Sequence, residues 1–223
     1  MKGIIIDGVV SSGKTSILKH LHRLISEQNP TSTKFFISEH YTERMLEHLK
    51  DKGELDGSHI KAHVDQLIHT LASFQSMLDN SKFRDNPKGA DLFVTLERFI
   101  LTHLSSVDIG DKYSLDEVKA HFEILNKLGV KQVALIIPES RLKENIMSTL
   151  QYRNDAWLDY LYSRGGEKEI IEYYINWQNN FLEYINKFKD IIDTLVIEVK
   201  DQDYLQYSNT IFNSCIKSDI LSK

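Results

Sequence analysis

The chain has 223 residues, which is long enough for one α/β domain with a full hydrophobic core and requires no second domain. Hydrophobic residues make up 41% of the sequence, as in globular proteins, and 26% of the residues are charged, with a net charge of -5. This balance argues against a nucleic-acid scaffold, which usually has a surplus of basic residues, so we expect no nucleic-acid partner.

The cysteine content and the hydropathy exclude further classes. Cys215 is the only cysteine, so the chain can form neither an intramolecular disulfide nor a zinc site made of cysteines alone. A single cysteine also fits a reducing compartment. The N-terminus enters a strand almost at once, without room for a signal peptide, and no apolar run approaches the roughly 20 residues that span a bilayer. We therefore expect a cytoplasmic protein without a membrane partner.

The strongest motif lies in residues 4–16. Three branched apolar residues predict a buried strand, and residues 8–15 match the pattern G-x-x-x-x-G-K-[ST] without a mismatch. Apolar residues at helical spacing follow. In this order of strand, loop and helix, backbone N–H groups and the helix N-terminus hold phosphate oxygens. The motif predicts binding of a nucleoside triphosphate; the alternative is an ordinary Gly-rich turn.

Short apolar strands and longer helices alternate along the rest of the chain. The later predicted strands are residues 34–38, 91–96, 132–137 and 194–199. The predicted helices are residues 13–28, 42–50, 58–78, 114–129, 139–163, 167–189 and 204–221. Five strands that alternate with helices predict one α/β domain over residues 1–223, with three layers in which helices flank a five-stranded parallel sheet.

Ligands of such sheets bind at the carboxyl ends of the strands. This rule selects the loop after Ile6, Glu39 after the second strand, the pair Glu97-Arg98 after the third, and the helix that follows Pro138. We expect these places to converge on one crevice.

Other motifs choose among the classes of phosphate-loop protein. A GTPase would show Asn-Lys-x-Asp, whereas Asn186-Lys187 is followed by Asp190 at the wrong spacing. A motor or AAA-type ATPase would show Asp-Glu at the end of an apolar strand, whereas Asp116-Glu117 opens a helix. The small size and the long helical segment of about residues 41–80 favour small-molecule kinases, in which such a segment forms the acceptor pocket.

At several segments the chain resembles the deoxyribonucleoside kinases and, more broadly, the P-loop nucleoside and nucleotide kinase group. Asp7 followed by residues 8–16 is similar to their phosphate loop. Glu39 matches the Glu of their Glu-Pro pair, with His40 in place of the Pro. Gln75, in Phe-Gln-Ser, is similar to the Gln that pairs with the nucleobase in that family.

Later segments extend the resemblance over roughly residues 1–200. Glu97-Arg98-Phe99 looks like the family's Glu-Arg-Ser, with Phe in place of Ser. The pair Pro138-Glu139 and the aromatic helix with Tyr174 and Trp177 also fit. The resemblance implies a P-loop kinase fold and ATP-dependent phosphoryl transfer to a small molecule.

Two features depart from the family pattern. Its members carry several arginines just after Pro-Glu, in a lid over the transferred phosphoryl group. In the corresponding region, about residues 139–166, the arginines are Arg141, Arg153 and Arg164. The helical segment of residues 101–129 has no close counterpart, and it could face the substrate or form a dimer surface.

The resemblance implies specific roles, with ATP and Mg²⁺ as cofactors. The predicted nucleotide-binding residues are Gly8, Ser11, Ser12, Gly13, Lys14, Thr15 and Ser16. Thr15 and Glu97 are expected to hold Mg²⁺ directly or through water, and Lys14 to act in catalysis. Glu39 is the candidate general base and is expected to contact the acceptor hydroxyl, with a solvated loop residue as the alternative.

Three further roles have a plain structural alternative. Arg98 is expected to bind the acceptor or the transferring phosphate, or else to pair with Glu97 or Glu39. Gln75 could read a base edge or be an ordinary surface residue. Arg153 is expected in the lid, with a solvated helix face as the alternative.

Two other clusters have structural interpretations. His59 and His63 share a helix face without the Glu of a zinc-protease motif, and we interpret them as surface residues. A group of aromatic residues is expected to pack on the sheet or on a partner subunit, so a homodimer stays open. This group is Tyr173, Tyr174, Trp177, Phe181 and Tyr184.

The leading hypothesis is an ATP-dependent kinase of a nucleoside-like small molecule. A second enzyme hypothesis keeps the phosphate loop and changes the acceptor to a nucleoside monophosphate or an antibiotic-type alcohol. The alternative of another class is a non-catalytic nucleotide-binding regulatory module.

Overall fold

The computed structural model describes residues 1–28, 33–82, 92–106, 109–152 and 155–217. Five parallel strands form one sheet in the order β2-β3-β1-β4-β5. The strands are β1 (Lys2–Gly8), β2 (Thr33–Ile37), β3 (Leu92–Glu97), β4 (Val130–Ile136) and β5 (Thr194–Glu198). The predicted α/β fold with a five-stranded parallel sheet is therefore confirmed.

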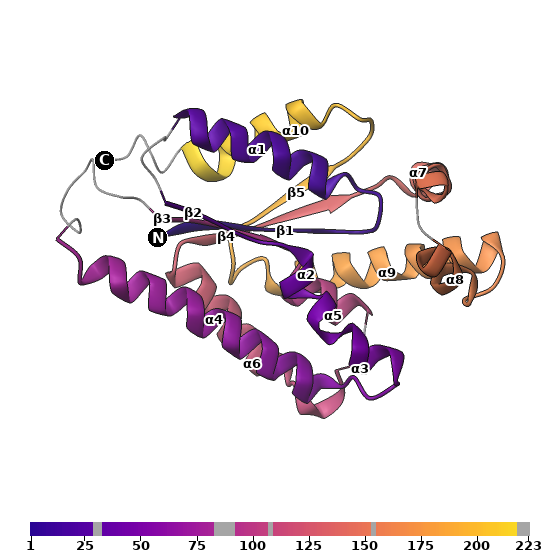
Figure 1. The fold of residues 1–223 in the computed structure, drawn as a ribbon, viewed down its shortest axis with the longest axis horizontal. Helices are drawn as coiled ribbons and strands as arrows, with labels where there is room; N and C mark the ends of the chain where they lie inside the picture. The colour runs from indigo at the N-terminus through magenta and orange to yellow at the C-terminus, as the bar shows by residue number, and fades with distance from the viewer. Residues whose placement is uncertain (29–32, 83–91, 107–108, 153–154, 218–223) are drawn as a thin grey trace.

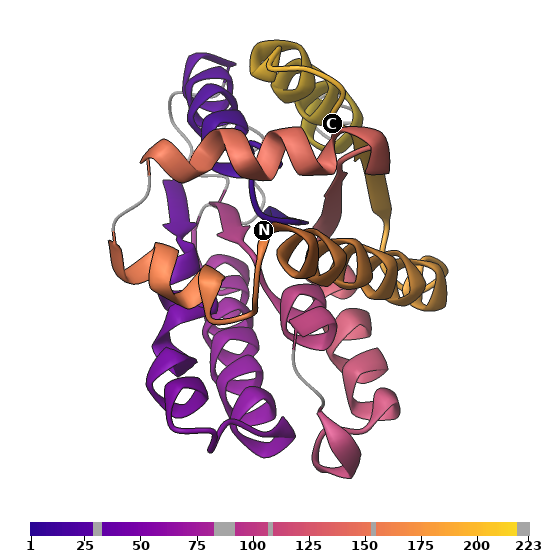
Figure 2. The same cartoon turned by 90° about the vertical axis from the view of Figure 1, so that its right-hand side faces the viewer.

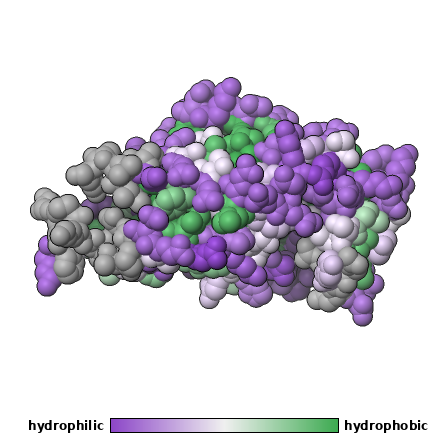
Figure 3. All heavy atoms as spheres, turned by 90° about the horizontal axis from the view of Figure 1, so that it is seen from above, coloured by the Kyte–Doolittle hydropathy of each residue, from purple (hydrophilic) through white to green (hydrophobic). Residues whose placement is uncertain are grey.

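Helices cover both faces of the sheet (Figure 1). On one face lie α1 (Lys14–Gln28) and α10 (Tyr204–Ile211). On the other face lie α4 (Gly57–Asp79), α5 (Ile100–Ser106), α6 (Leu115–Lys127) and α9 (Glu167–Phe188). Seen from the α1 and α10 side, the surface is mostly hydrophilic, with smaller hydrophobic areas between the polar side chains (Figure 3).

The central strand β1 shows why the sheet has a core on each side. Successive side chains of a strand point to opposite faces. Ile4 and Ile6 accordingly pack in the cluster under α1 and α10, and Ile5 packs in the cluster under the other helices. All three are fully buried, as expected for the middle strand of a sheet covered on both faces.

The helical connections at the carboxyl ends of the strands differ from the prediction. Residues 39–51 form α2 (Glu39–Thr42), a 3-10 turn η1 (Arg44–Leu46) and α3 (Glu47–Asp51), so helical structure begins at Glu39. The single helix predicted over residues 139–163 is interrupted. It consists of α7 (Glu139–Thr149), the 3-10 turn η3 (Leu150–Tyr152) and α8 (Asp155–Tyr162).

The view onto this edge shows α7 crossing in front of the strands, below α1 and α10 (Figure 2). The predicted C-terminal helix begins at Tyr204 as α10 and continues as the π-helical segment η4 (Phe212–Lys217), and residues 218–221 lie outside the described residues. None of the described helices is long and apolar enough to cross a membrane.

The segment 101–129 belongs to the helical layer below the sheet. It contains most of α5, the 3-10 turn η2 (Gly110–Lys112) and α6, which begins at a capping box formed by Ser114 and Glu117. Helix α5 packs against α9 and β1, and α6 packs against β4 and α4. Six consecutive residues of α5 are buried, so this part of the segment is core.

Asp7, at the end of β1, connects this strand to the start of α5 and to β4 through hydrogen bonds. Its carboxylate accepts hydrogen bonds from the backbone N–H of Phe99 at 3.0 Å, from the Thr102 hydroxyl at 2.5 Å and from Gln132 Nε2 at 3.1 Å. The side chain is fully buried, and burial raises the pKa of Asp7 although these three donors oppose the shift. The start of the phosphate loop is thereby fixed to α5 and β4.

We expect Asp7→Ala to lower the free energy of unfolding by about 2–4 kcal/mol, because buried donors on Phe99 and Thr102 lose their acceptor. Asp7→Asn should cost less, since Gln132 Oε1 has no partner among the described residues and can accept from the new amide. Urea denaturation measures both, with the exposed Asp190→Ala as control. If Asp7→Ala unfolds at the same urea concentration as that control, the proposed anchoring role is wrong.

Candidate functional site

The phosphate loop, residues 8–15, connects β1 to α1 in the predicted order. Gly8 lies so close to β4 that a Cβ atom would stand 2.5 Å from the carbonyl oxygen of Leu135. At Gly13, where φ is +77°, a Cβ atom would stand 2.3 Å from the ring of Tyr204. Ser11 has a φ of 64°, which is unusual for a residue with a side chain. Both glycines are thus required by close packing, and the loop conformation is built into the fold.

Lys14 folds back over this loop. Its Nζ donates hydrogen bonds to the carbonyl oxygens of Gly8 at 2.9 Å and Val9 at 2.8 Å, and to Ser12 Oγ at 3.3 Å. Burial and the positive charge of Arg98 lower the pKa of Lys14 to about 7, although nearby carboxylates oppose the shift. The ammonium group therefore sits in a place where a negatively charged ligand would restore its ordinary pKa.

Thr15 and Glu97, the pair predicted to hold a metal, are in direct contact. Thr15 Oγ1 donates a hydrogen bond to Glu97 Oε1 at 2.8 Å, and Glu97 is buried at the end of β3. A hydroxyl and a carboxylate beside a phosphate loop fit Mg²⁺, which binds one or two protein oxygens together with phosphate oxygens and water. Ser16 follows in the first turn of α1.

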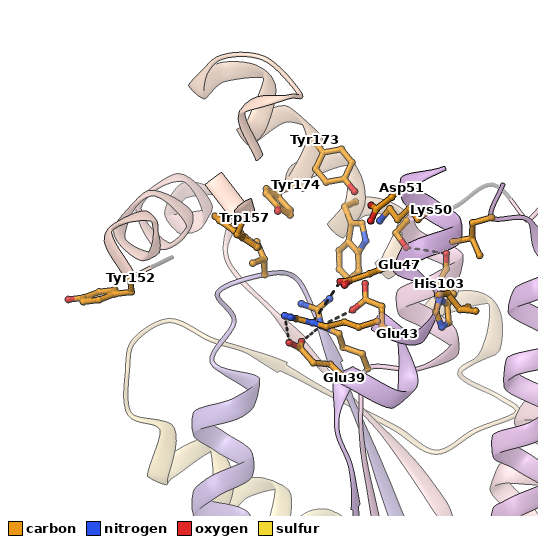
Figure 4. Close-up of a pocket in the computed structure, with 17 residues that line it drawn as sticks. Glu39, Glu43, Glu47, Lys50, Asp51, His103, Tyr152, Trp157, Tyr173 and Tyr174 are labelled. Atoms are coloured by element: carbon orange, nitrogen blue, oxygen red, sulfur yellow. Dashed lines mark hydrogen bonds and ion pairs between the residues drawn. The ribbon is translucent and has the colours of Figure 1, made fainter. Parts of the chain in front are cut away.

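Glu39 and Arg98 meet at the carboxyl edge of the sheet. Arg98 Nε lies 3.1 Å from Glu39 Oε2 and 3.3 Å from Glu43 Oε2, and Arg44 Nη2 lies 2.6 Å from Glu39 Oε1 (Figure 4). The predicted alternative for Arg98, an ion pair with Glu39, is thus present. Arg98 also has a φ of 60°, and its backbone N–H donates to the carbonyl oxygen of Ile6 at 2.9 Å. This hydrogen bond holds Arg98 beside the end of β1.

The charge state of Glu39 follows from these neighbours. Partial burial raises its pKa, but Arg98, Arg44 and Lys14 together outweigh burial and lower the pKa below its ordinary value. Glu39 is therefore an ionised carboxylate at neutral pH, which is the state that can accept a proton. Because Lys14 contributes to this shift, the phosphate loop and Glu39 lie within electrostatic range of one another.

A pocket of about 640 Å³ opens at this edge. Its volume is typical of a site for one small molecule. The residues that line it are Val10, Glu39, Glu43, Arg44, Leu46, Glu47, Lys50, Asp51, Leu55, Arg98, His103, Ser106, Tyr152, Trp157, Tyr173, Tyr174 and Trp177. Val10 belongs to the phosphate loop, so the loop and the pocket share a wall.

The aromatic residues of α9 fall into two groups, one that packs in the core and one that lines the pocket. Phe181 is fully buried and stacks on Trp177 with 5.1 Å between ring centroids, as expected for core packing. Tyr173, Tyr174 and Trp177 instead line the pocket, together with Trp157 from α8. The prediction that the whole group packs on the sheet or on a partner subunit therefore missed the pocket face of α9.

The structure does not bring Gln75 to the other predicted site residues. Gln75 Oε1 accepts a hydrogen bond from the N-terminal amino group of Met1 at 2.5 Å, and its Nε2 donates to Asp79 Oδ1 at 2.7 Å. Met1 precedes β1, so its contact with Gln75 places Gln75 at the amino edge of the sheet, opposite the phosphate loop. Gln75 does not line the pocket. The alternative of an ordinary surface residue fits its position.

The predicted lid region is described only in part. Arg153 lies outside the described residues. Helix α7 ends over the phosphate loop, where Thr149 Oγ1 lies 3.1 Å from Ser11 Oγ. The guanidinium of Arg164 stands 3.7 Å from the ring centroid of Tyr173, which is a cation–π contact.

Sequence reasoning missed several charged residues of the pocket. Glu43, Glu47 and Asp51 follow Glu39 at steps of four, and all of them line the pocket. This spacing was a signal in the sequence, since residues four apart share a helix face. His103 also lines the pocket, and its Nε2 lies 2.9 Å from the carbonyl oxygen of Thr42. No local pattern pointed to it.

No protein-family model matches the chain, and none of the curated proteins matches it either. Among solved structures, the chain is similar to the YorR protein from Bacillus subtilis, whose crystal structure was determined in complex with phosphorylated GDP. The similarity covers 95% of this chain and 94% of that chain, with a TM-score of 0.54 and 15% sequence identity. At this level of identity the likeness shows that the two chains share a fold.

Proposed function

We propose that the protein is an ATP-dependent phosphotransferase that moves the γ-phosphoryl group of ATP to a small molecule, with the hydroxyl of a nucleoside-like compound as the leading acceptor. The observation that carries the proposal is the shared wall between the phosphate loop and the pocket, with Val10 in both and Glu39 and Arg98 at the sheet edge next to them. This arrangement suits two ligands bound side by side. The nucleotide bound by YorR, a protein of the same fold, also supports a nucleotide as one of them.

The residues have separate tasks in this reaction. The backbone of the phosphate loop and Lys14 would bind the β- and γ-phosphates, with Lys14 leaving the carbonyl oxygens of Gly8 and Val9 to do so. Mg²⁺, held by Thr15 and Glu97, would neutralise charge on the phosphate oxygens. Glu39 would take the proton of the acceptor hydroxyl. Arg98 would orient Glu39 and stabilise the negative charge of the transferring group.

A non-catalytic nucleotide-binding module is the alternative of another class. It would bind ATP and need neither Glu39 nor Arg98 for turnover. Release of ADP in a coupled assay separates the two functions when nucleosides, nucleotides and other alcohols are offered as acceptors. If ATP binds but no acceptor stimulates ADP release above background, the kinase proposal fails.

Lys14→Ala should reduce acceptor-stimulated ADP release by at least about 10²-fold, because the loop loses its charge for the transferring phosphate. The matched control is Lys19→Ala, an exposed lysine of the same helix, which should behave as wild type. Full activity of Lys14→Ala would contradict the role of the phosphate loop.

Binding of ATP should take up protons at pH values above 7. With its pKa lowered to about 7, Lys14 is mostly neutral in alkaline solution, and the phosphates of a bound nucleotide raise that pKa. Calorimetric titration in two buffers with different ionisation enthalpies measures the uptake. Lys14→Arg should remove it, since a guanidinium keeps its proton. Equal binding enthalpies of wild type in both buffers would contradict the environment described for Lys14.

Glu39→Gln should lower turnover by at least about 10²-fold with little effect on ATP binding, because the amide cannot accept the hydroxyl proton. Steady-state kinetics with the best acceptor measures this change. Glu123→Gln, an exposed glutamate on α6, serves as the control. An unchanged turnover rate would remove Glu39 from the mechanism.

A further inference from the structure

One wall of the pocket is rich in carboxylates. Its acidic residues recur at every fourth position along α2, η1 and α3, so they share one side of this helical path (Figure 4). These residues are Glu39, Glu43, Glu47 and Asp51, and the cationic residues that line the pocket are Arg44, Lys50 and Arg98. Among the described lining residues, negative charges therefore outnumber positive ones.

The two guanidinium groups are already engaged. Arg98 contacts both Glu39 and Glu43, and Arg44 contacts Glu39 closely and Glu47 at 3.8 Å. A phosphate on the acceptor would have to displace these carboxylates and would then face them as uncompensated like charges. The pocket therefore disfavours a phosphorylated acceptor.

The outer part of this carboxylate-rich wall, Glu47 and Asp51, is only weakly neutralised by the cations that the structure describes. The side chain of Asp51 has neither an ion pair nor a hydrogen bond with any residue that the structure describes, and Glu47 has only the long contact to Arg44. Both side chains are accessible from the pocket. They can pair with a positive group that a ligand brings in.

The facing wall is aromatic. Tyr173, Tyr174 and Trp177 come from α9, and Trp157 comes from α8. Figure 4 shows the rings of Tyr173, Tyr174 and Trp157 around the same space as the acidic side chains. Aromatic faces attract cations, and a carboxylate adds direct charge attraction. Aromatic rings opposite the carboxylates of Glu47 and Asp51 therefore form a site suited to an ammonium group.

Trp177 provides independent support for a ligand in this pocket. Only 6% of the residue is exposed, and its indole N–H donates no hydrogen bond to any described residue. The indole nitrogen itself is open to solvent, so a ligand or a water molecule can accept this hydrogen bond. Because Trp177 lines the pocket, an oxygen atom of the bound molecule can accept this hydrogen bond.

We propose, building on the phosphotransferase function above, that the acceptor is an alcohol that carries a protonated amine and no phosphate. The amine lies between Glu47, Asp51 and the aromatic wall, and an oxygen atom accepts from Trp177. In the transfer, the acceptor hydroxyl oxygen forms a bond to the γ-phosphorus and its proton passes to Glu39. The bond between the γ-phosphorus and the bridging oxygen breaks, and ADP leaves with the electron pair.

Intrinsic fluorescence gives a binding assay that does not depend on turnover, because the only two tryptophans of the chain, Trp157 and Trp177, both line the pocket. Two matched series are titrated in slightly acidic buffer, where the amines are protonated. The first is thymidine, its 3′-amino-3′-deoxy analogue and its 3′-monophosphate, and the second is glucose, glucosamine and glucose 6-phosphate. In at least one series, the amine should bind at least about fivefold more tightly than the neutral compound, and the phosphate at least about fivefold more weakly.

Asp51→Asn and Glu47→Gln should each reduce the preference for the amine by at least about threefold. The control, Glu183→Gln, changes an exposed carboxylate of α9 outside the pocket and should leave the preference intact. The proposal is overturned if the phosphate binds as tightly as the amine, if no compound of either series binds, or if neither pocket variant changes the preference.

Release of ADP with the same compounds separates this inference from the function on which it rests. Turnover that is fastest with a phosphorylated acceptor would overturn the inference and leave the phosphotransferase in place. Tight binding of the amines together with ATP, but without ADP formation from any of them or from other alcohols, would overturn the phosphotransferase.

Discussion

The site depends on the buried carboxylate of Asp7. Asp7 is the residue before the phosphate loop. Its carboxylate accepts hydrogen bonds from Phe99 and Thr102 at the start of α5 and from Gln132 in β4. The neighbouring hydrogen bond from the Arg98 N–H to the Ile6 carbonyl fixes the residue after β3 to the same strand. Loop, arginine and helix are thus held at one edge of the sheet by hydrogen bonds that water cannot reach, and the pocket forms where they meet.

Electrostatics then divides this edge into two parts. Near the loop, Arg98 and Arg44 balance Glu39 and keep it ionised, while burial lowers the pKa of Lys14 to about 7. Lys14 could therefore pair with a bound phosphate, and the ionised Glu39 could accept the proton of an acceptor hydroxyl. Farther out, Asp51 faces aromatic rings without a partner among the residues described, which favours a ligand of positive charge. The proposed phosphate donor and the proposed acceptor alcohol thus bind in parts of the site that differ in electrostatic potential.

Much of the fold could be predicted because its signals are local. The loop of residues 8–15 is one contiguous motif, and each strand is an apolar run. The position of Gln75 could not be predicted in this way, because α4 has 23 residues and is about 35 Å long, so a motif near its end can lie far from one near its start. The acidic wall had a visible spacing, but it is carried by three short helical pieces whose path depends on tertiary contacts such as the hydrogen bond between Thr42 Oγ1 and the Glu97 carbonyl.

The most direct test of the two-substrate site is mass spectrometry of the products formed from ATP, Mg²⁺ and a panel of alcohols, including amine-bearing ones. We predict that an acceptor gains the mass of one phosphoryl group, that one ADP forms for each product molecule, and that Lys14→Ala and Glu39→Gln both suppress the product. Bound ATP that yields no phosphorylated acceptor, or that yields only ADP and inorganic phosphate, would contradict it.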